Sequence, residues 1–539
     1  MKINNKDHGN KMLSGAMSLT VSVLIVKLIG FLYKLPLSRV LGDEGMGYFN
    51  SAYTVFVFFY MLATGGIPKA VSMLVTDANV KKGRISGREI LAACLTLFLF
   101  IGAFLCLGIL LFGAPIAKII GNPDAALSLL LISPAVLFVC ISGVLRGFLT
   151  GNKRLGVIAI SEVIEGAVKF VFGLAFAMYG AYRSYPIRVI SALAVSGVSV
   201  GSMLSMIFLL ISSKKQKRED KAGQSERDSK DRARIYAELF RFAIPITVTS
   251  AIMGLSSMLD LSMFVNRLVA GGTPRREAIA LYGNYTTLAV PMLNLVSALL
   301  SSVSSSALPE LRGAVSSHSP QRMRDVAAHA ISVISFFAAP AALASYLYSK
   351  ELLSLLFTEE SALKGAAMLS ALSPSMFFLP LLTFVNTVLE AGGKTKIPLV
   401  SMSVAVAVKS IISYFALADG RVGALAAPLS TSVSYLVALA ISMLVLATGV
   451  KIPSRSLLAA VRPCVCAFIS IGFVRILYNY STNGAYYPIA FIVSALASAA
   501  IYFILLLVFN GDFWRKFAKF VNFSKLSDTS MANITKEGS

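Results

Sequence analysis

Long apolar runs separated by short polar segments recur along the whole chain of 539 residues. A helix needs about 20 residues to cross the hydrocarbon core of a membrane, whereas membrane strands show only about ten residues of alternating pattern. The pattern therefore predicts an all-α polytopic membrane protein with 14 transmembrane helices. The runs cover residues 13–38, 47–76, 89–113, 125–146, 156–180, 186–211, 239–266, 279–308, 326–348, 363–389, 397–417, 423–448, 457–478 and 486–509.

The composition supports the same class. Hydrophobic residues make up 56% of the chain and charged residues 14%, whereas a soluble globular protein carries about 25% charged residues. A soluble protein of this length would form several domains, and too few polar residues are present to cover their surfaces.

The positive charges indicate an orientation. Of the 49 Lys and Arg residues, 33 lie in or next to the segments on the side of the N-terminus, against 11 on the other side. Cytoplasmic segments carry the excess of Lys and Arg, so we expect both termini in the cytoplasm. The net charge of +23 is then mostly a topology signal, and nucleic-acid binding is not favoured because no basic soluble domain is present.

One charged segment divides the chain. Residues 212–236 follow the sixth run and are poor in apolar residues, which is typical of a cytoplasmic tether or a partner site. We expect an N-terminal lobe of six helices over 1–211, a C-terminal lobe over 237–450, and two further helices with a cytoplasmic tail over 451–539. Short matches between the halves, such as LTVSV at Leu19 and ITVTS at Ile246, suggest two pseudo-symmetric bundles around a cavity.

Three cations lie in or beside the first run, at Lys27, Lys34 and Arg39. Lys27 would lie near the middle of the membrane, where a cation costs about 2.5–3.5 kcal/mol on insertion scales. Lys34 is two turns further on, on almost the same helix face, and Arg39 is near the outer boundary. Such side chains are expected to face a polar cavity and an anion.

The fifth run offers further charges, because Glu162, Glu165 and Lys169 share one stripe of a helix. They either are neutralised, Glu165 by Lys169 and Glu162 by Lys27 or by contact with cytoplasmic water, or form a cavity wall with surplus positive charge. Lys409 favours the second interpretation, since no acid lies near it in its own run.

Asp260 and Arg267 in the seventh run fit one helix face, as a second polar position or as a plain ion pair. The five cysteines and three histidines show no metal-ligand or disulfide spacing, so no cofactor or metal is expected. No loop is rich enough in Asp, Glu and His to suggest an enzyme.

Three stretches resemble a known family. They are the segment from Lys27 to Val75, LYGNYTTLAVPMLNLVSALLSSVSSSALPEL from Leu281 to Leu311, and VLEAGGKTKIP from Val388 to Pro398. They are similar to the stage V sporulation protein B group of polysaccharide transporters. That group belongs to the multidrug/oligosaccharidyl-lipid/polysaccharide flippase superfamily, which also holds lipid II flippases and multidrug exporters.

The resemblance implies two lobes, alternating access and flipping of an undecaprenyl-diphosphate-linked sugar across the bacterial plasma membrane, for cell-wall peptidoglycan or sporulation. Lipid II flippases carry cavity arginines in the first, second and eighth helices. Lys27 takes the first of these places, whereas Tyr33, Phe59-Tyr60 and Tyr285 stand near the others, so lysines would have to supply the charge. The alternatives are a cation-coupled drug antiporter, which would need an acidic cavity, and a scaffold for cell-wall synthesis enzymes that binds through residues 212–234.

Overall fold

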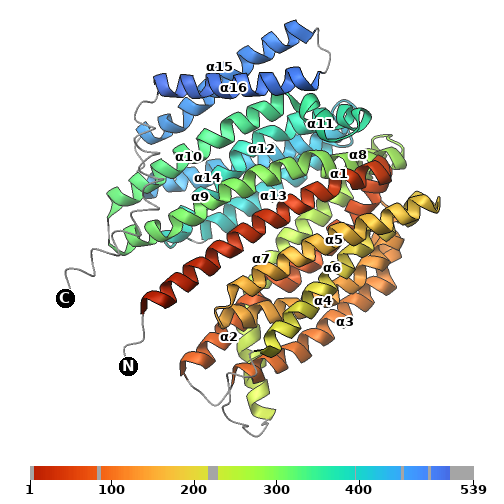
Figure 1. Ribbon diagram of the computed structural model, residues 1–539, viewed down its shortest axis with the longest axis vertical. Coiled ribbons are helices and arrows are strands. Elements are labelled where there is room, and N and C mark those ends of the chain that lie inside the picture. Colours follow the sequence, from red (N-terminus) through yellow and green to blue (C-terminus); the bar gives the residue numbers. More distant parts are fainter. Residues whose placement is uncertain are drawn as a thin grey trace. The chain divides into compact units, whose positions relative to one another are not determined.

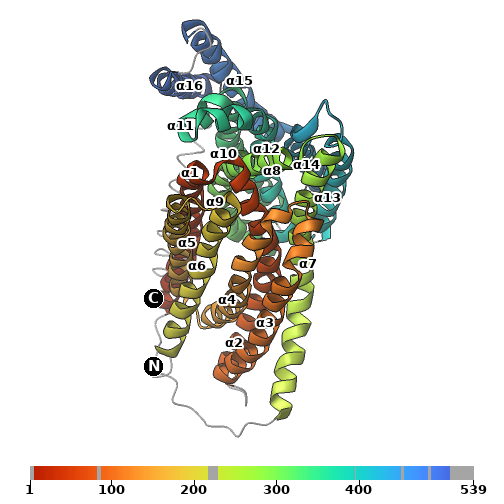
Figure 2. The same cartoon turned by 90° about the vertical axis from the view of Figure 1, so that its right-hand side faces the viewer.

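The computed structural model of the protein describes residues 5–81, 86–215, 229–317, 319–394, 396–450, 454–482 and 487–509, and all regular elements in these ranges are helices (Figures 1 and 2). The chain forms two compact units, one of residues 1–291 with 410–427 and one of residues 292–409 with 428–539. The central part of the predicted linker, residues 216–228, lies outside the described residues.

The helices of the first unit are α1 (Asn5–Gly65), α2 (Ile67–Lys81), α3 (Gly87–Ile119), η1 (Pro123–Ala125), α4 (Ala126–Gly151), α5 (Leu155–Tyr182), α6 (Ile187–Lys215), α7 (Ser229–Ala270), α8 (Arg275–Asn284) and the wide π-helical turn η3 (Tyr285–Ala289). The helices that form mainly the second unit are α9 (Val290–Ser316), α10 (Pro320–Leu347), α11 (Ser349–Leu356), α12 (Glu359–Ala391), α13 (Lys396–Ala416), α14 (Ala426–Val450), α15 (Ser454–Thr482) and α16 (Pro488–Phe509), with the short η4 (Gly423–Leu425) before α14.

Eleven stretches of the described chain are long and apolar enough to cross a membrane. They confirm the predicted all-α membrane architecture. The count of 14 stays a prediction, because the stretch Val21–Ala78 covers two of the predicted spans and neither α5 nor α7 is among the eleven. Helix α5 carries Glu162, Glu165 and Lys169, which lower its mean hydropathy.

Helix α1 is two helices joined at one residue. The backbone of Gly42 has φ 63° and ψ −176°, a conformation that glycine adopts without steric cost and other residues avoid. The segment between the first two predicted spans is therefore a sharp joint and not a loop. The second part of α1 ends at Gly65, and α2 begins at Ile67 after the Gly65-Gly66 pair.

In the first unit, α3, α4, α5 and α6 lie side by side, and α1 packs against α4, α5 and α6 (Figure 1). The long helix α7 packs along α1 and α2, and α8 packs against α1 (Figure 2). Because α7 and α8 pack with α1, the first unit reaches to Pro291. The division into lobes at residues 212–236 stays a prediction.

The second unit has two apolar cores. Helices α9, α10, α12, α14 and the first part of α13 share one core. Helices α15 and α16 pack on α10 around a second core that contains Tyr348, Tyr478 and Tyr502. An ion pair of 2.6 Å between Arg475 on α15 and the buried Glu351 on α11 ties these helices together.

Candidate functional site

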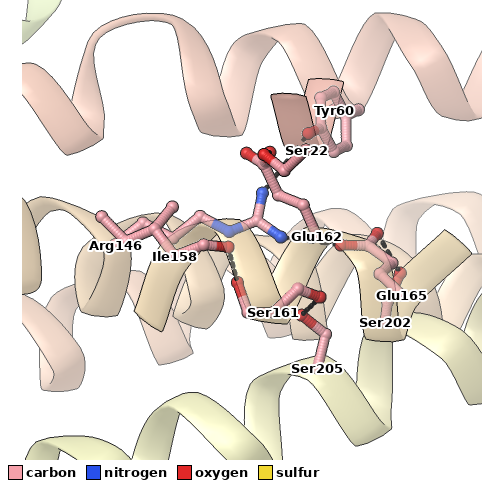
Figure 3. A network of polar contacts seen from close by, with 9 residues as sticks. All are labelled: Ser22, Tyr60, Arg146, Ile158, Ser161, Glu162, Glu165, Ser202 and Ser205. Atoms are coloured by element: carbon pink, nitrogen blue, oxygen red, sulfur yellow. Dashed lines mark hydrogen bonds and ion pairs between the residues drawn. The ribbon is translucent and has the colours of Figure 1, made fainter. Parts of the chain in front are cut away.

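A buried arginine joins four helices of the first unit (Figure 3). Arg146 on α4 donates to the carboxylate of Glu165 on α5 at 2.7 Å and to the hydroxyl of Tyr60 on α1 at 3.5 Å. Ser202 on α6 donates to the second oxygen of the same carboxylate at 3.0 Å. These bonds hold the Glu165 carboxylate between α4 and α6.

A second carboxylate shares the arginine. Glu162 lies one turn before Glu165 on α5, and both attract the Arg146 guanidinium. Ser22 on α1 donates to Glu162 at 3.3 Å. Figure 3 shows both glutamates beside the guanidinium. We refer to Ser22, Tyr60, Arg146, Glu162, Glu165 and Ser202 as the Arg146 cluster.

The Arg146 cluster has one buried cation for two partly buried carboxylates. Arg146 is only 8% exposed, and its Nε donates to no atom of the described chain. Two carboxylates and one guanidinium sum to −1 when all are ionised. Removal of one partner from a buried ion pair typically costs about 3–5 kcal/mol, because the other charge is left uncompensated. Both acidic side chains of α5, Glu162 and Glu165, therefore interact with Arg146.

The structure gives Glu165 and Glu162 different partners from those that the sequence suggested. Spacing along α5 suggested that Glu165 pairs with Lys169, but its cationic partner is Arg146. The suggested partner of Glu162 was Lys27, but that lysine is exposed and Glu162 accepts a hydrogen bond from Ser22. Arg146 is not among the residues predicted from the sequence, because it is the last residue of the fourth apolar run and therefore lies next to a predicted loop. In the structure, α4 continues beyond it to Gly151.

Two lysines lie close to each other in the first unit. The Lys34 ammonium on α1 donates to the backbone carbonyl of Thr286 in η3 at 2.6 Å. The Lys169 ammonium on α5 lies 5.1 Å from the centroid of the Tyr53 ring. The two ammonium groups are near enough to repel each other. In the described part of the chain, neither has a carboxylate as a partner.

Aromatic side chains hold these lysines in place. Tyr33 is 2% exposed, donates to the Ala194 carbonyl at 3.3 Å, and packs its ring against Phe49 and Phe170 at 5.9 and 5.8 Å between centroids. Phe49 stacks on Tyr53, which faces Lys169. The aromatic contacts fix α1 against α5 and place the Tyr53 ring beside the Lys169 ammonium.

The other sequence-predicted residues take separate places. Lys27 and Arg39 are exposed on α1. The Arg267 guanidinium on α7 lies 4.0 Å from the centroid of the Tyr414 ring and donates to the Tyr414 carbonyl at 2.9 Å, while Asp260 is half-buried on the same helix. Lys409 is half-buried on α13 and belongs to the second unit. The site thus contains Lys34, Lys169, Glu162 and Glu165 of the predicted set.

The described residues contain no group of three or more His, Cys, Asp or Glu side chains that could hold a metal ion. The two charged positions described above in the first unit are the lysine pair and the Arg146 cluster. Lys169 lies one turn after Glu165 on α5, so the two positions are adjacent along that helix. The chemistry available here is charge recognition.

Comparison with known proteins adds relatives over nearly the whole chain. Stage V sporulation protein B of Bacillus subtilis (strain 168) is 24% identical over 505 residues, which cover 92% of this chain and 95% of that protein. The lipid II flippase MurJ of the same organism is 24% identical over 423 residues, which cover 75% of this chain and 77% of that protein.

The fold is similar to a solved structure of the lipid II flippase MurJ in an inward closed conformation. The TM-score is 0.70 at 15% identity, and the match covers 92% of this chain and 99% of that chain. A family model described as MatE matches residues 245–415. The model of another family, polysaccharide biosynthesis protein, matches residues 12–312, which are more than half of the chain. The protein therefore belongs to the polysaccharide biosynthesis protein family.

Proposed function

We propose that the protein is a flippase that moves a saccharide linked to a lipid diphosphate across the membrane. The observation that carries this proposal is the pair of Lys34 and Lys169, two ammonium groups that repel each other and have a carbonyl and an aromatic ring as partners. Their surplus positive charge suits a ligand with two negative charges in close succession.

A cation without an anion inside a membrane protein is costly, so it needs a functional reason. An ammonium in the membrane interior costs about 2.5–3.5 kcal/mol on insertion scales, and ionisable residues there pair with one another or mark substrate pathways. A diphosphate would neutralise both lysines and accept several of their N–H groups at once. The lipid tail would stay in the bilayer while the charged head group enters the protein.

Lys27 extends this path along α1. It lies seven residues before Lys34, two turns along the same helix face, and is exposed. Arg39 lies beyond Lys34 towards the Gly42 joint and is also exposed. We infer that Lys27 meets the diphosphate before Lys34 does, and that Lys409 on α13 contributes a charge from the second unit during the cycle.

The relatives support this substrate class. MurJ of B. subtilis is named a lipid II flippase, and stage V sporulation protein B covers nearly the same length as this chain. We infer that the undecaprenyl-diphosphate-linked sugar is a peptidoglycan or polysaccharide precursor and that the protein is a transporter without enzymatic activity. We also infer that both termini are cytoplasmic in the bacterial plasma membrane.

The MatE match over residues 245–415 favours a second candidate, a cation-coupled antiporter. Such a protein needs carboxylates that are open to a cationic ligand. In the first unit, Glu165 is bonded to Arg146 and Ser202, and Glu162 is attracted to the same guanidinium. Because both carboxylates already interact with Arg146, they are less available to a cationic ligand, which argues against the antiporter.

Binding of undecaprenyl diphosphate to the purified protein, measured by native mass spectrometry, tests the flippase proposal. Lys34→Met and Lys169→Met should each weaken binding by about tenfold or more, because each removes one charge-assisted contact. Lys364→Met is the matched control, since its ammonium pairs with Glu360 at the surface at 2.8 Å. Absence of binding to the wild-type protein, together with binding of cationic dyes, would favour the antiporter.

A further inference from the structure

The contact of Lys34 with η3 has a specific cause in the sequence YTTLAVP, Tyr285 to Pro291. The turn is wide, and the Val290 N–H bonds to the carbonyl of Tyr285, five residues earlier. The next residue is Pro291, which has no N–H. The Thr286 carbonyl therefore accepts no hydrogen bond from the backbone of residue 290, whose N–H bonds to Tyr285, or from residue 291, which has no N–H.

Lys34 supplies the missing donor. Its ammonium lies 2.6 Å from the Thr286 carbonyl, so a charge of α1 completes the backbone bonding of the turn that follows α8. Unpaired backbone groups are costly away from water. Wide turns of this kind leave the regular helix ladder and are frequent at functional sites.

The Lys34 bond lies near a set of contacts that hold α8 and η3 against α1. Asn50 donates to the Thr287 hydroxyl at 2.8 Å, and the hydroxyls of Thr54 and Tyr282 are 2.9 Å apart. Gly47 and Gly283 face each other so closely that a Cβ on either would collide with backbone atoms of the other helix. The two hydrogen bonds are between neutral groups, and an exposed ion pair of 3.9 Å between Arg276 on α8 and Glu44 on α1 adds a charged contact.

We propose that the bond from Lys34 to the Thr286 carbonyl is a latch between α1 and η3 that the substrate itself opens. The proposal rests on the proposed function. A carbonyl is a neutral acceptor, whereas a diphosphate carries full negative charges and therefore attracts an ammonium more strongly. When a diphosphate reaches Lys34 and Lys169, the Lys34 ammonium leaves Thr286 for the phosphate oxygens. The Thr286 carbonyl then lacks a donor, and α1 holds η3 and the adjoining α8 less tightly.

The latch explains why a lysine that binds substrate also has a partner in the absence of substrate. Repulsion from Lys169 already makes the charged form of Lys34 less favourable at this position. An anion that binds between the two lysines removes this repulsion and withdraws the donor from η3 in one step. A neutral ligand would do neither, so the latch selects for charge.

The variant Pro291→Ala tests the latch without a change to either lysine. Alanine restores an N–H five residues after Thr286, which competes with Lys34 for its carbonyl. The reporter is the rate of maleimide modification of Ala278→Cys, a fully buried position of α8, in protein whose five native cysteines are replaced by alanine and which is held in lipid nanodiscs. Pro340→Ala in α10 is the matched control, because this proline lies inside a helix of the second unit.

In the wild-type background, undecaprenyl diphosphate should raise the modification rate about tenfold, the size of change that a lost hydrogen bond to a charged donor produces. Pro291→Ala should show a raised rate without the ligand and bind the ligand at least as tightly as wild type, whereas Pro340→Ala should behave as wild type. The latch is wrong if the ligand binds without a change in rate, or if Pro291→Ala reacts as slowly as Pro340→Ala. Failure of the ligand to bind to wild type would instead refute the proposed function, and the comparison of the two proline variants without ligand would still test the competition at Thr286.

Discussion

Replacement of Arg146 by methionine should destabilise the protein more than any other single removal of a charge in the first unit that we consider. The side chain is 8% exposed and is shared by Glu162 and Glu165. Methionine retains most of the apolar volume, so the change tests the charge and not the packing. Two carboxylates would then face each other in a buried site without a cation.

The expected cost is about 3–5 kcal/mol, the range for breaking a buried pair by removal of one partner. Glu165→Gln should cost less, because it leaves one guanidinium with one carboxylate, Glu162. The double variant Arg146→Met with Glu162→Gln should recover part of the loss, since it removes one of the two repelling groups. This order follows from a cluster in which one cation serves two acids.

The assay is the temperature at which half of the purified protein remains monodisperse on size-exclusion chromatography in one fixed detergent. Arg183→Met is the matched control, because Arg183 is an exposed arginine at the end of α5 whose guanidinium lies 5.7 Å from the centroid of the Tyr179 ring. An exposed cation–π contact contributes about 0.5–1 kcal/mol. The reasoning is refuted if Arg146→Met loses no more stability than Arg183→Met.

Three further predictions concern other charges. Lys169→Arg should bind undecaprenyl diphosphate by native mass spectrometry almost as well as wild type, whereas Lys169→Met should not, and equal loss in both would show that geometry matters there more than charge. Lys27→Ala should abolish complementation of a flippase-deficient strain while the protein still inserts into the membrane; full complementation would contradict a role for this lysine. Glu351→Gln should lower the free energy of unfolding by about 3–5 kcal/mol, because it leaves the Arg475 guanidinium without its buried carboxylate. Lys364→Met breaks an exposed pair on α12 and should lower it by only about 0.3–0.5 kcal/mol. Equal melting temperatures of the two variants would contradict the prediction.

The fold class could be predicted from sequence because hydropathy is a local property. Each apolar run is visible without knowledge of its neighbours, and the runs fall almost entirely on helical residues of the described chain, although several helices extend well beyond their run and run 47–76 spans the end of α1 and the start of α2. The joint at Gly42 was harder to see. A polar segment between two runs normally indicates a loop, but here a single glycine in a left-handed conformation turns the chain without one.

The pairing of the charges could not be predicted, because spacing shows only partners on the same helix. Glu165 and Lys169 fit one face of α5, and Asp260 and Arg267 fit one face of α7. In the structure, Glu165 bonds to Arg146 on α4 and Arg267 contacts Tyr414 on α13. Such contacts depend on which helices pack together.

One signal in the sequence did point to Arg146. The residues after it, Gly147 to Gly151, are apolar or small, so the helix had no reason to end at the arginine. A cation followed by another apolar turn lies inside a span and needs a partner there. The acids of α5 are the available partners. If Arg146 is placed inside the membrane, these acids are predicted to pair with Arg146 and not with Lys169.

The position of Arg146 decides how the charges of the site are interpreted. If Glu165 neutralised Lys169, Lys34 would be the only one of the two lysines without a carboxylate partner in the described part of the chain. Because Arg146 binds Glu165 and attracts Glu162, neither acid pairs with the lysines on α1 and α5. One arginine on α4 thus separates the acidic position from the basic one, and the basic position is where we propose that an anionic head group binds. An antiporter for cations would require the opposite, an arrangement in which the acids are open and the lysines are paired.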